Sequence, residues 1–219
     1  MKEHSVEEAA ALMGISPQRV RAMLDSGRLH GRKVGRAWIV SDLDLSGRWQ
    51  PGRPLSAGSA WALLALLAGD SPGWVDAAVR SRLRGRIRKG EVVDLLQKSE
   101  ARALIHIWRV LPGDLDKIAA EFPIVRSGLS AGYRELDVVP LGQQLDGYIS
   151  ADDLAKIERR FRPDGAPDRP NVVLRVPAVP WVLKQSYRAP LPVVAGDLLP
   201  SDDPRVVRAA REVLRSPQS

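Results

Sequence analysis

The order of caps, glycines and charges near the N-terminus constrains the fold of this chain more than any other feature. Ser5 and Glu8 have the spacing of a capping box, in which each side chain binds a backbone N–H of the other residue. Apolar residues follow with helical spacing, and Gly14 can end the helix in the left-handed conformation. Ser16 and Pro17 then match the cap and the first position of a second helix. The segment therefore predicts two short helices joined by a tight turn.

The second predicted helix, which ends at Gly27, has two different faces at 100° per residue. The face expected to pack on the first helix consists of Val20, Met23 and Leu24. The residues that point away from or flank that face are Gln18, Arg19, Arg21 and Ala22. Glutamine can pair with adenine, and arginine with guanine or a phosphate, while a small alanine allows close approach to a groove. We therefore predict that this face, with Arg28 just beyond the helix, binds DNA.

A small basic hairpin is predicted after the two helices, with Gly35 at its tip. Its outward cations, suited to phosphate or minor-groove contact, are Arg32, Lys33 and Arg36. The residues expected to return to the core are Val34, Trp38 and Val40. Ser41 and Asp42 are expected to begin a short terminal helix or turn. Two helices followed by a hairpin form a winged helix-turn-helix, although a scaffold or a protein-binding module could share the pattern.

This stretch resembles the excisionase-type branch of the MerR-like winged helices. The shared motifs are VEEAAxxxGIS, an S-G-x-L step and a K-V-G-R-x-W wing, in that order. The resemblance places Gln18, Arg19 and Arg21 on the base-reading helix. It places Arg32, Lys33 and Arg36 in the wing. Pro17 and Gln18 replace the residue types common in that branch, so its base preference is not carried over.

Charge and composition limit the partners of the chain. The net charge of +7 and the pI of about 10.1 favour polyanions such as DNA, RNA or anionic membranes. Cysteine is absent, which excludes disulfides and thiolate metal sites and fits a reducing cytoplasm. Residues 1–20 do not resemble a signal peptide, and the longest apolar run, Ala60–Ala68, is too short to cross a membrane. We therefore expect a soluble cytoplasmic protein with no membrane partner.

The pattern of elements predicts an α+β protein with two domains. Residues 1–50 form the winged helix-turn-helix, residues 51–56 a linker, and residues 57–219 a larger α+β domain for partner binding or oligomerisation. Helices are predicted at 57–68, at 74–98 with interruptions at Gly85 and Gly90, at 115–122 with Asp114 as cap, at 151–161 and from Pro204 to 214. Strands are predicted at 103–111, apolar enough to be buried, and at 124–131, 145–149 and 171–176.

Six cations and no acid lie between residues 80 and 89. A helix would place Arg80, Arg84 and Arg88 on one exposed stripe. The stripe buried by the same helix would consist of Val75, Val79, Leu83 and Ile87. A strand would place every arginine on one face, but the apolar spacing on both sides favours the helix. The exposed stripe could contact DNA phosphates or an acidic protein, or it could be a solvated face.

The sequence shows no pattern typical of a catalytic site. His4, His30 and His106 lie in unrelated contexts, and the motifs of phosphate-binding loops, zinc proteases and serine hydrolases are missing. The acid pairs 152–153 and 202–203 match first-turn positions of helices, where the helix dipole favours negative charge. We therefore expect a protein that is not an enzyme and holds no cofactor or metal.

The larger domain resembles the AbiEi-type antitoxins of abortive-infection (type IV) toxin–antitoxin pairs. The motifs that carry the resemblance are SRLRGR, Y-I-S-x-x-D-L, N-V-V-L-R-V and P-V-V-A-x-D-L-L-x-S-D-D-P-R. It implies an antitoxin that binds double-stranded DNA at its own promoter, represses its operon and counteracts a nucleotidyltransferase-like toxin. The alternatives are an excisionase-like recombination factor, a stand-alone transcriptional regulator or, least favoured, an enzyme. One winged helix offers few contacts, so two half-sites are expected, filled by a homodimer or by two monomers side by side.

Overall fold

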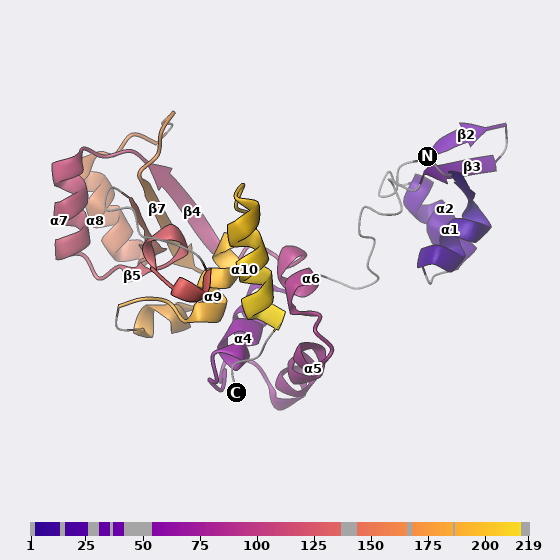
Figure 1. The fold of residues 1–219 in the computed structure, drawn as a ribbon, viewed down its shortest axis with the longest axis horizontal. Helices are drawn as coiled ribbons and strands as arrows, with labels where there is room; N and C mark the ends of the chain where they lie inside the picture. Colours follow the sequence, from indigo (N-terminus) through magenta and orange to yellow (C-terminus); the bar gives the residue numbers. More distant parts are fainter. Residues whose placement is uncertain are drawn as a thin grey trace. The chain divides into compact units, whose positions relative to one another are not determined.

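The computed structural model shows a chain that divides into two units, Met1–Arg53 and Pro54–Ser219 (Figure 1). The residues that the structure describes are 3–13, 16–25, 31–35, 37–41, 54–136, 144–165, 168–185 and 187–215. Mixed helices and strands make this an α+β protein, as the sequence predicts. No helix within the described ranges is long and apolar enough to span a bilayer.

The smaller unit combines two helices with a three-stranded antiparallel sheet of order β1-β3-β2. Its elements are β1 Glu3–Ser5, α1 Val6–Met13, α2 Pro17–Asp25, β2 Arg32–Val34 and β3 Ala37–Ser41. The capping box forms as predicted: the Ser5 amide donates to Glu8 Oε2 at 2.8 Å, and the Glu8 amide donates to Ser5 Oγ at 3.2 Å. The core consists of Val6, Ala9, Ala10, Val20, Leu24 and Val40, with Trp38 packed against it.

The larger unit contains a mixed four-stranded sheet of order β4-β7-β6-β5, in which β6 and β7 are parallel and the other pairs are antiparallel. Its strands are β4 Ala103–Trp108, β5 Val125–Arg126, β6 Leu145–Tyr148 and β7 Val172–Pro177. Its α-helices are α4 Ala57–Leu67, α5 Ala77–Arg88, α6 Val92–Gln97, α7 Pro112–Glu121, α8 Ala151–Phe161, α9 Leu191–Leu198 and α10 Pro204–Arg215. Short 3₁₀ turns are η1 Gly128–Ser130, η2 Arg134–Leu136 and η3 Pro180–Lys184.

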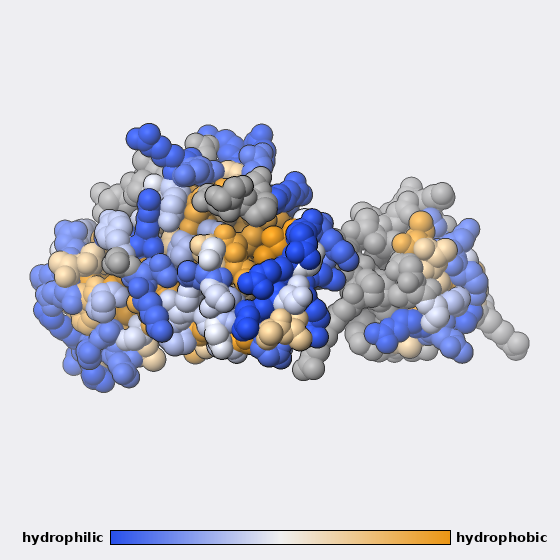
Figure 2. Space-filling view, turned by 90° about the horizontal axis from the view of Figure 1, so that it is seen from below, coloured by the Kyte–Doolittle hydropathy of each residue, from blue (hydrophilic) through white to orange (hydrophobic). Residues whose placement is uncertain are grey.

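Two apolar clusters hold the larger unit together. One joins a sheet face to α7 and α8, which lie side by side in Figure 1. The other gathers α4, α5, α6, α9 and α10 around the fully buried Trp61 of α4. As expected for a helix that is apolar almost all round, α4 lies in this core. Figure 2 shows apolar residues over the middle of the unit and hydrophilic ones at its margins.

Several predicted element boundaries in the larger unit were wrong. Gly85 lies inside α5, and the helical segment is interrupted at Gly90, where φ is 70°. Asp114 lies in the first turn of α7, which begins at Pro112, because proline fits the first helical position. The strand expected at 124–131 ends at Arg126. Its continuation turns at Gly128, where φ is 47° and an added Cβ would lie 2.0 Å from Asp146 Oδ2.

The strand predicted at 103–111 forms as β4, but the prediction that it is buried was wrong. The side chains of Leu104, Ile105 and Ile107 are 70%, 59% and 48% exposed. β4 lies at one end of the sheet order, so β7 covers one of its edges only. Of its apolar residues, Trp108 reaches the core near α7 and α8, and Ala103 packs against the cluster around α4.

Candidate nucleic-acid interface

Helix α2 buries one face and exposes the other, as its sequence predicts. Val20 is fully buried and Leu24 is 4% exposed. The residues on the exposed face are Gln18, Arg19, Arg21 and Ala22. The helix begins at Pro17, and the Arg19 amide donates to Ser16 Oγ at 3.3 Å. The cap therefore fixes the start of α2 and with it the direction of the exposed face.

Arg21 is already engaged within the smaller unit. Its Nη2 atom lies 2.7 Å from Oε1 of Glu7 on α1, and both side chains are at least half exposed. An exposed ion pair of this kind contributes little to stability, so it can exchange for a phosphate contact. It nevertheless turns Arg21 towards α1. Of the two arginines on the described α2, Arg19 is the one outside such an ion pair, which makes it the stronger candidate for base contact.

The hairpin presents two exposed cations next to this helix in sequence, Arg32 and Lys33 on β2. Lys33 lies opposite Trp38 in the β2–β3 register, and its Nζ atom is 4.9 Å from the centroid of the indole ring. This cation–π contact holds the ammonium group on the strand surface. Gly35 forms the tip with φ of 61°, a conformation that favours glycine.

One prediction about the hairpin was wrong. Val34 is 47% exposed instead of buried, because it pairs with Ala37 beside the turn, while the core is reached further along β3 by Trp38 and Val40. Ser41 is the last residue of β3 and pairs with Glu3 of β1, a strand that the sequence did not predict. The helix or turn predicted to begin at Ser41 and Asp42 would lie outside the described residues. On the first helix, Leu12 belongs to the apolar residues with helical spacing, but its side chain is 65% exposed.

Gly31 is a positioning residue that sequence reasoning missed. A Cβ built at this position would lie 2.7 Å from Cδ2 of Leu24 and 2.9 Å from the carbonyl oxygen of Ile39. The start of the hairpin therefore approaches α2 more closely than any larger residue would allow. The other predicted residues of this region, Gly14, Gly27, Arg28, His30, Arg36 and Asp42, lie outside the described residues, as does the side chain of Met23.

The arginine stripe on α5 lies in the other unit and is partly occupied. The helix forms but begins at Ala77 instead of Trp74, so Val75 of the predicted stripe precedes it. Leu83 is buried, and Val79 and Ile87 pack on the core. Arg80 is half-buried, and its Nη1 atom donates to the carbonyl oxygens of Val75 and, at 3.3 Å, Pro72. Arg84 and Arg88 are exposed. The prediction of three equivalent exposed arginines was therefore wrong for Arg80, which holds the loop before the helix.

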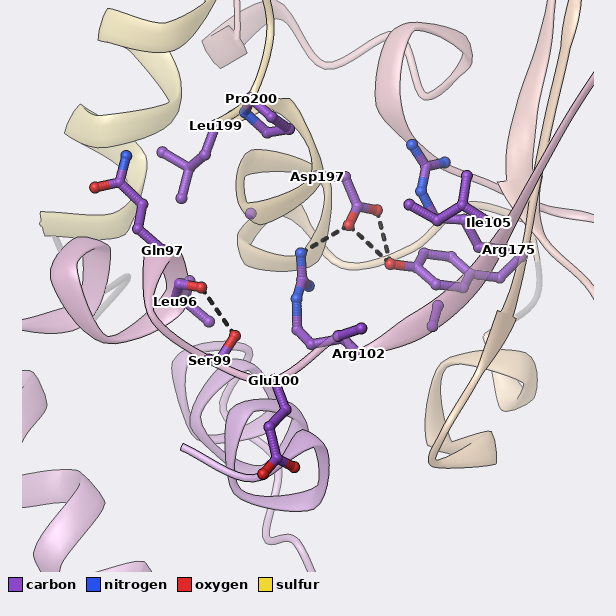
Figure 3. A pocket seen from close by; sticks show the side chains of 14 residues that line it. Leu96, Gln97, Ser99, Glu100, Arg102, Ile105, Arg175, Asp197, Leu199 and Pro200 are labelled. Atoms are coloured by element: carbon purple, nitrogen blue, oxygen red, sulfur yellow. Dashed lines mark hydrogen bonds and ion pairs between the residues drawn. The ribbon is translucent and has the colours of Figure 1, made fainter. Parts of the chain in front are cut away.

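A cavity of about 330 Å³ in the larger unit contains a buried polar network (Figure 3). Asp197 accepts hydrogen bonds from Arg102 Nη2 at 3.0 Å, Ser127 Oγ at 2.6 Å and Tyr148 Oη at 2.8 Å. Burial, together with the neighbouring Asp197 carboxylate, holds the pKa of Tyr148 well above its ordinary value. The phenol is therefore a hydrogen-bond donor at neutral pH, and the network ties α9 to the sheet.

The acid pairs lie at helix starts, as their sequence positions predict: Asp152 and Asp153 are in the first turn of α8, whose cap is Ser150, and Asp203 precedes α10. Asp153 accepts a hydrogen bond from Lys156 Nζ at 2.6 Å, and its amide donates to Ser150 Oγ at 3.1 Å. The Arg205 amide donates to Asp203 Oδ1 at 2.9 Å at the start of α10. Bonds from Lys156 and from the Arg205 amide lower the pKa values of Asp153 and Asp203. Within the described residues, no group of three or more His, Cys, Asp or Glu side chains is placed to hold a metal.

Comparison with known proteins identifies the N-terminal segment. A family model described as a helix-turn-helix domain matches residues 5–46, which include α1, α2 and the hairpin. No curated protein matches the chain. No solved structure matches it either. The chain therefore carries a helix-turn-helix domain of the kind found in DNA-binding regulators, while the antitoxin resemblance of the larger unit gains no support from these comparisons.

Proposed function

We propose that this protein is a sequence-specific DNA-binding transcriptional regulator whose helix α2 enters the major groove. The observation that carries the proposal is the division of α2 into a buried face with Val20 and an exposed face with Gln18, Arg19 and Ala22. Glutamine and arginine have the donor and acceptor geometry that reads adenine and guanine. Ala22 between them leaves room for the helix to approach the base edges.

The hairpin supplies the contacts that fix orientation. Arg32 and Lys33 are exposed on β2, and phosphate contacts from such residues position a reading helix without reading sequence. Gly31 holds the hairpin close to α2, so the base-reading and phosphate-binding residues form one surface. The net charge of +7 adds a field that favours polyanions.

The test is fluorescence anisotropy with a labelled duplex taken from directly upstream of the protein's own reading frame. The double variant Arg19→Ala/Lys33→Ala should bind roughly 100-fold more weakly or worse, since each such contact is worth about 1–3 kcal/mol. The matched control is Arg159→Ala/Arg208→Ala, which removes the same charge from two exposed positions of the larger unit. Equal affinities of the two double variants would overturn the proposal.

We further propose that the regulator is an antitoxin that represses its own operon and counteracts a nucleotidyltransferase-like toxin. The order of the motifs in the larger unit supports this, and exposed apolar residues there, such as Leu111 at 72%, offer surface for a protein partner. Co-expression with the product of the neighbouring reading frame should relieve growth arrest. If growth is not restored, the antitoxin role is removed and a stand-alone regulator remains. An adjacent integrase gene would instead favour an excisionase-like recombination factor.

We assign the larger unit a binding role and no catalytic one. The Asp197 side chain, which is 3% exposed, has its oxygens occupied by an arginine, a serine and a tyrosine, which leaves it unsuited to proton transfer. Nuclease or nucleotidyl-transfer activity that disappears on replacing Asp153 or Asp203 would contradict this assignment.

A further inference from the structure

The outer edge of β4 lacks the features that usually protect an edge strand. Natural edge strands carry lysine, proline, bulges or other charged residues that prevent pairing with a second chain. The six residues of β4, ALIHIW, include no Lys, Arg, Asp, Glu, Pro or Gly. Leu104, Ile105 and Ile107 are about half to two-thirds exposed along it. No other described strand pairs with this edge.

The hydrogen bonds at both ends of β4 identify which backbone groups face outward. The Ala178 amide donates to the Arg102 carbonyl on the β7 side at 2.9 Å. Antiparallel strands alternate between the two edges, so residues 103, 105 and 107 direct their amides and carbonyls away from β7. Asp164 agrees with this parity, because it exchanges two hydrogen bonds of 3.1 Å with Arg109 on the outer edge. The uncovered edge therefore runs from 103 to 107.

We propose that this edge pairs with the same edge of a second copy of the chain, antiparallel about a two-fold axis at Ile105. The three outward residues are symmetric about that position. Ile105 then pairs with itself, and Ala103 of each copy pairs with Ile107 of the other. Each of these pairs exchanges two backbone hydrogen bonds. A register shifted by two residues would place residue 109 opposite residue 103, but Asp164 already covers that position.

The side chains along the pairing fit a second copy. Leu104 of one copy lies across from His106 of the other, and the two Ile105 side chains meet on the opposite face of the sheet, as cross-strand neighbours do.

The small size of the contact limits the affinity of the pairing. Five paired residues extend over about 17 Å, which is a normal strand length but less than a permanent dimer interface needs. The pairing is therefore weak and concentration-dependent, and it is isologous, as two-fold dimers require. Its use in placing two α2 helices on two half-sites rests on the proposed DNA binding. The pairing itself does not.

Single cysteines test the pairing, because the chain contains no cysteine. In a hydrogen-bonded antiparallel pair the Cα atoms are about 5.5 Å apart, which a disulfide can span. We expect purified full-length Ile105→Cys, without DNA, to oxidise to a covalent dimer at least tenfold faster than Leu111→Cys. Leu111 is 72% exposed but lies outside the ladder. Equal rates would overturn the proposal, and so would crosslinking that needs a co-expressed second protein.

The register has its own test. Mixing Ala103→Cys with Ile107→Cys should give mixed disulfide dimers in excess of either homodimer, whereas an excess of homodimers would refute the two-fold at Ile105. None of these readouts involves DNA, so they can fail while the DNA-binding proposal holds, and the reverse.

Discussion

Helix α2 of the smaller unit and helix α5 of the larger unit both carry arginines that the sequence offers as DNA contacts, and the structure gives these arginines different surroundings. On α2, Arg19 points away from the core beside glutamine and alanine, in the same small unit as the basic hairpin. On α5, Arg80 donates to two loop carbonyls and Arg86 pairs with Glu91, while Arg84 and Arg88 are exposed. Arg21 of α2 is paired as well, with Glu7 of α1. Helix α2 is therefore distinguished by its exposed face, on which Arg19 lies with Gln18 and Ala22, and by its place in the same unit as the basic hairpin.

The largest expected effect comes from charging the core under each helix. Val20→Asp and Leu83→Asp each bury an unpaired carboxylate, which costs about 4 kcal/mol or more. A unit of 53 residues has at most about 8 kcal/mol of total stability. We expect Val20→Asp to unfold the smaller unit and abolish DNA binding while the larger unit stays folded, and Leu83→Asp to affect the larger unit. Amide NMR spectra of the full chain report both units at once.

The second prediction separates the two arginine clusters by salt dependence. Each lost phosphate contact lowers the slope of log affinity against log salt by about 0.9. The double variant Arg32→Ala/Lys33→Ala should therefore reduce the slope by nearly two, because both exposed cations lie on the hairpin. The double variant Arg84→Ala/Arg88→Ala removes equal charge from α5 and should change the slope by less than about 0.5. A comparable reduction from the α5 pair would extend the interface to the larger unit.

The difference between the two regions also explains what could be predicted from the sequence. The caps at Ser5, Ser16 and Ser150 depend on residues three positions apart, and the structure contains all three. The core-facing stripe of α5 depends on residues four positions apart, and Val79, Leu83 and Ile87 pack there as predicted. The burial of β4 and the surroundings of Arg80 depend on partners that the local pattern does not specify. β4 is apolar enough for a central strand, and the sheet order alone makes it an edge. Arg80 has the spacing of an exposed stripe, but residues 72–75 bring two backbone carbonyl oxygens within hydrogen-bonding distance of its guanidinium group.

The candidate DNA-binding residues follow the same division. Those on α2 could be assigned because one helical face had to be buried, and the structure buries Val20 and Leu24 there. The exposure of Val34 could not be predicted, because alternation along a strand does not say how far the core extends towards the turn. Gly31 had no signal in the sequence beyond being a glycine, since its role depends on the approach of Leu24 and Ile39.

A third prediction compares two arginines of α5 that differ in their partners. Arg80→Ala removes the donor that binds the carbonyls of Val75 and Pro72, and we expect a loss of about 1–2 kcal/mol in the free energy of unfolding. Arg84→Ala, one turn later and exposed, should change it by less than about 0.5 kcal/mol. Urea denaturation of the larger unit's signal measures both. Equal effects would mean that Arg80 does not act as a tether.

The smallest expected effects concern one helix cap from each unit. Ser16→Ala at α2 and Ser150→Ala at α8 each remove a hydroxyl that accepts an amide hydrogen bond, at a cost of about 1 kcal/mol. The α8 cap has an additional pH dependence. A hydrogen bond from Lys156, and a second one from the Ser150 hydroxyl, lower the pKa of Asp153 below its ordinary value. The stability that Asp153 adds is therefore complete above its unfolded pKa and is lost as pH falls through the lowered folded pKa.

Ser150→Ala should move the pKa of Asp153 back towards its ordinary value, because one of the two hydrogen bonds to its carboxylate is gone. The acid-side loss of stability then begins at a higher pH than in the unmodified protein. Carboxyl-carbon NMR titration of Asp153 measures the shift directly, with Ser16→Ala as the control that leaves it unchanged. Lys156→Ala should raise the pKa further than Ser150→Ala does, since the lysine makes the larger contribution. The reverse order would show that the serine hydroxyl, and with it the cap, controls this carboxylate.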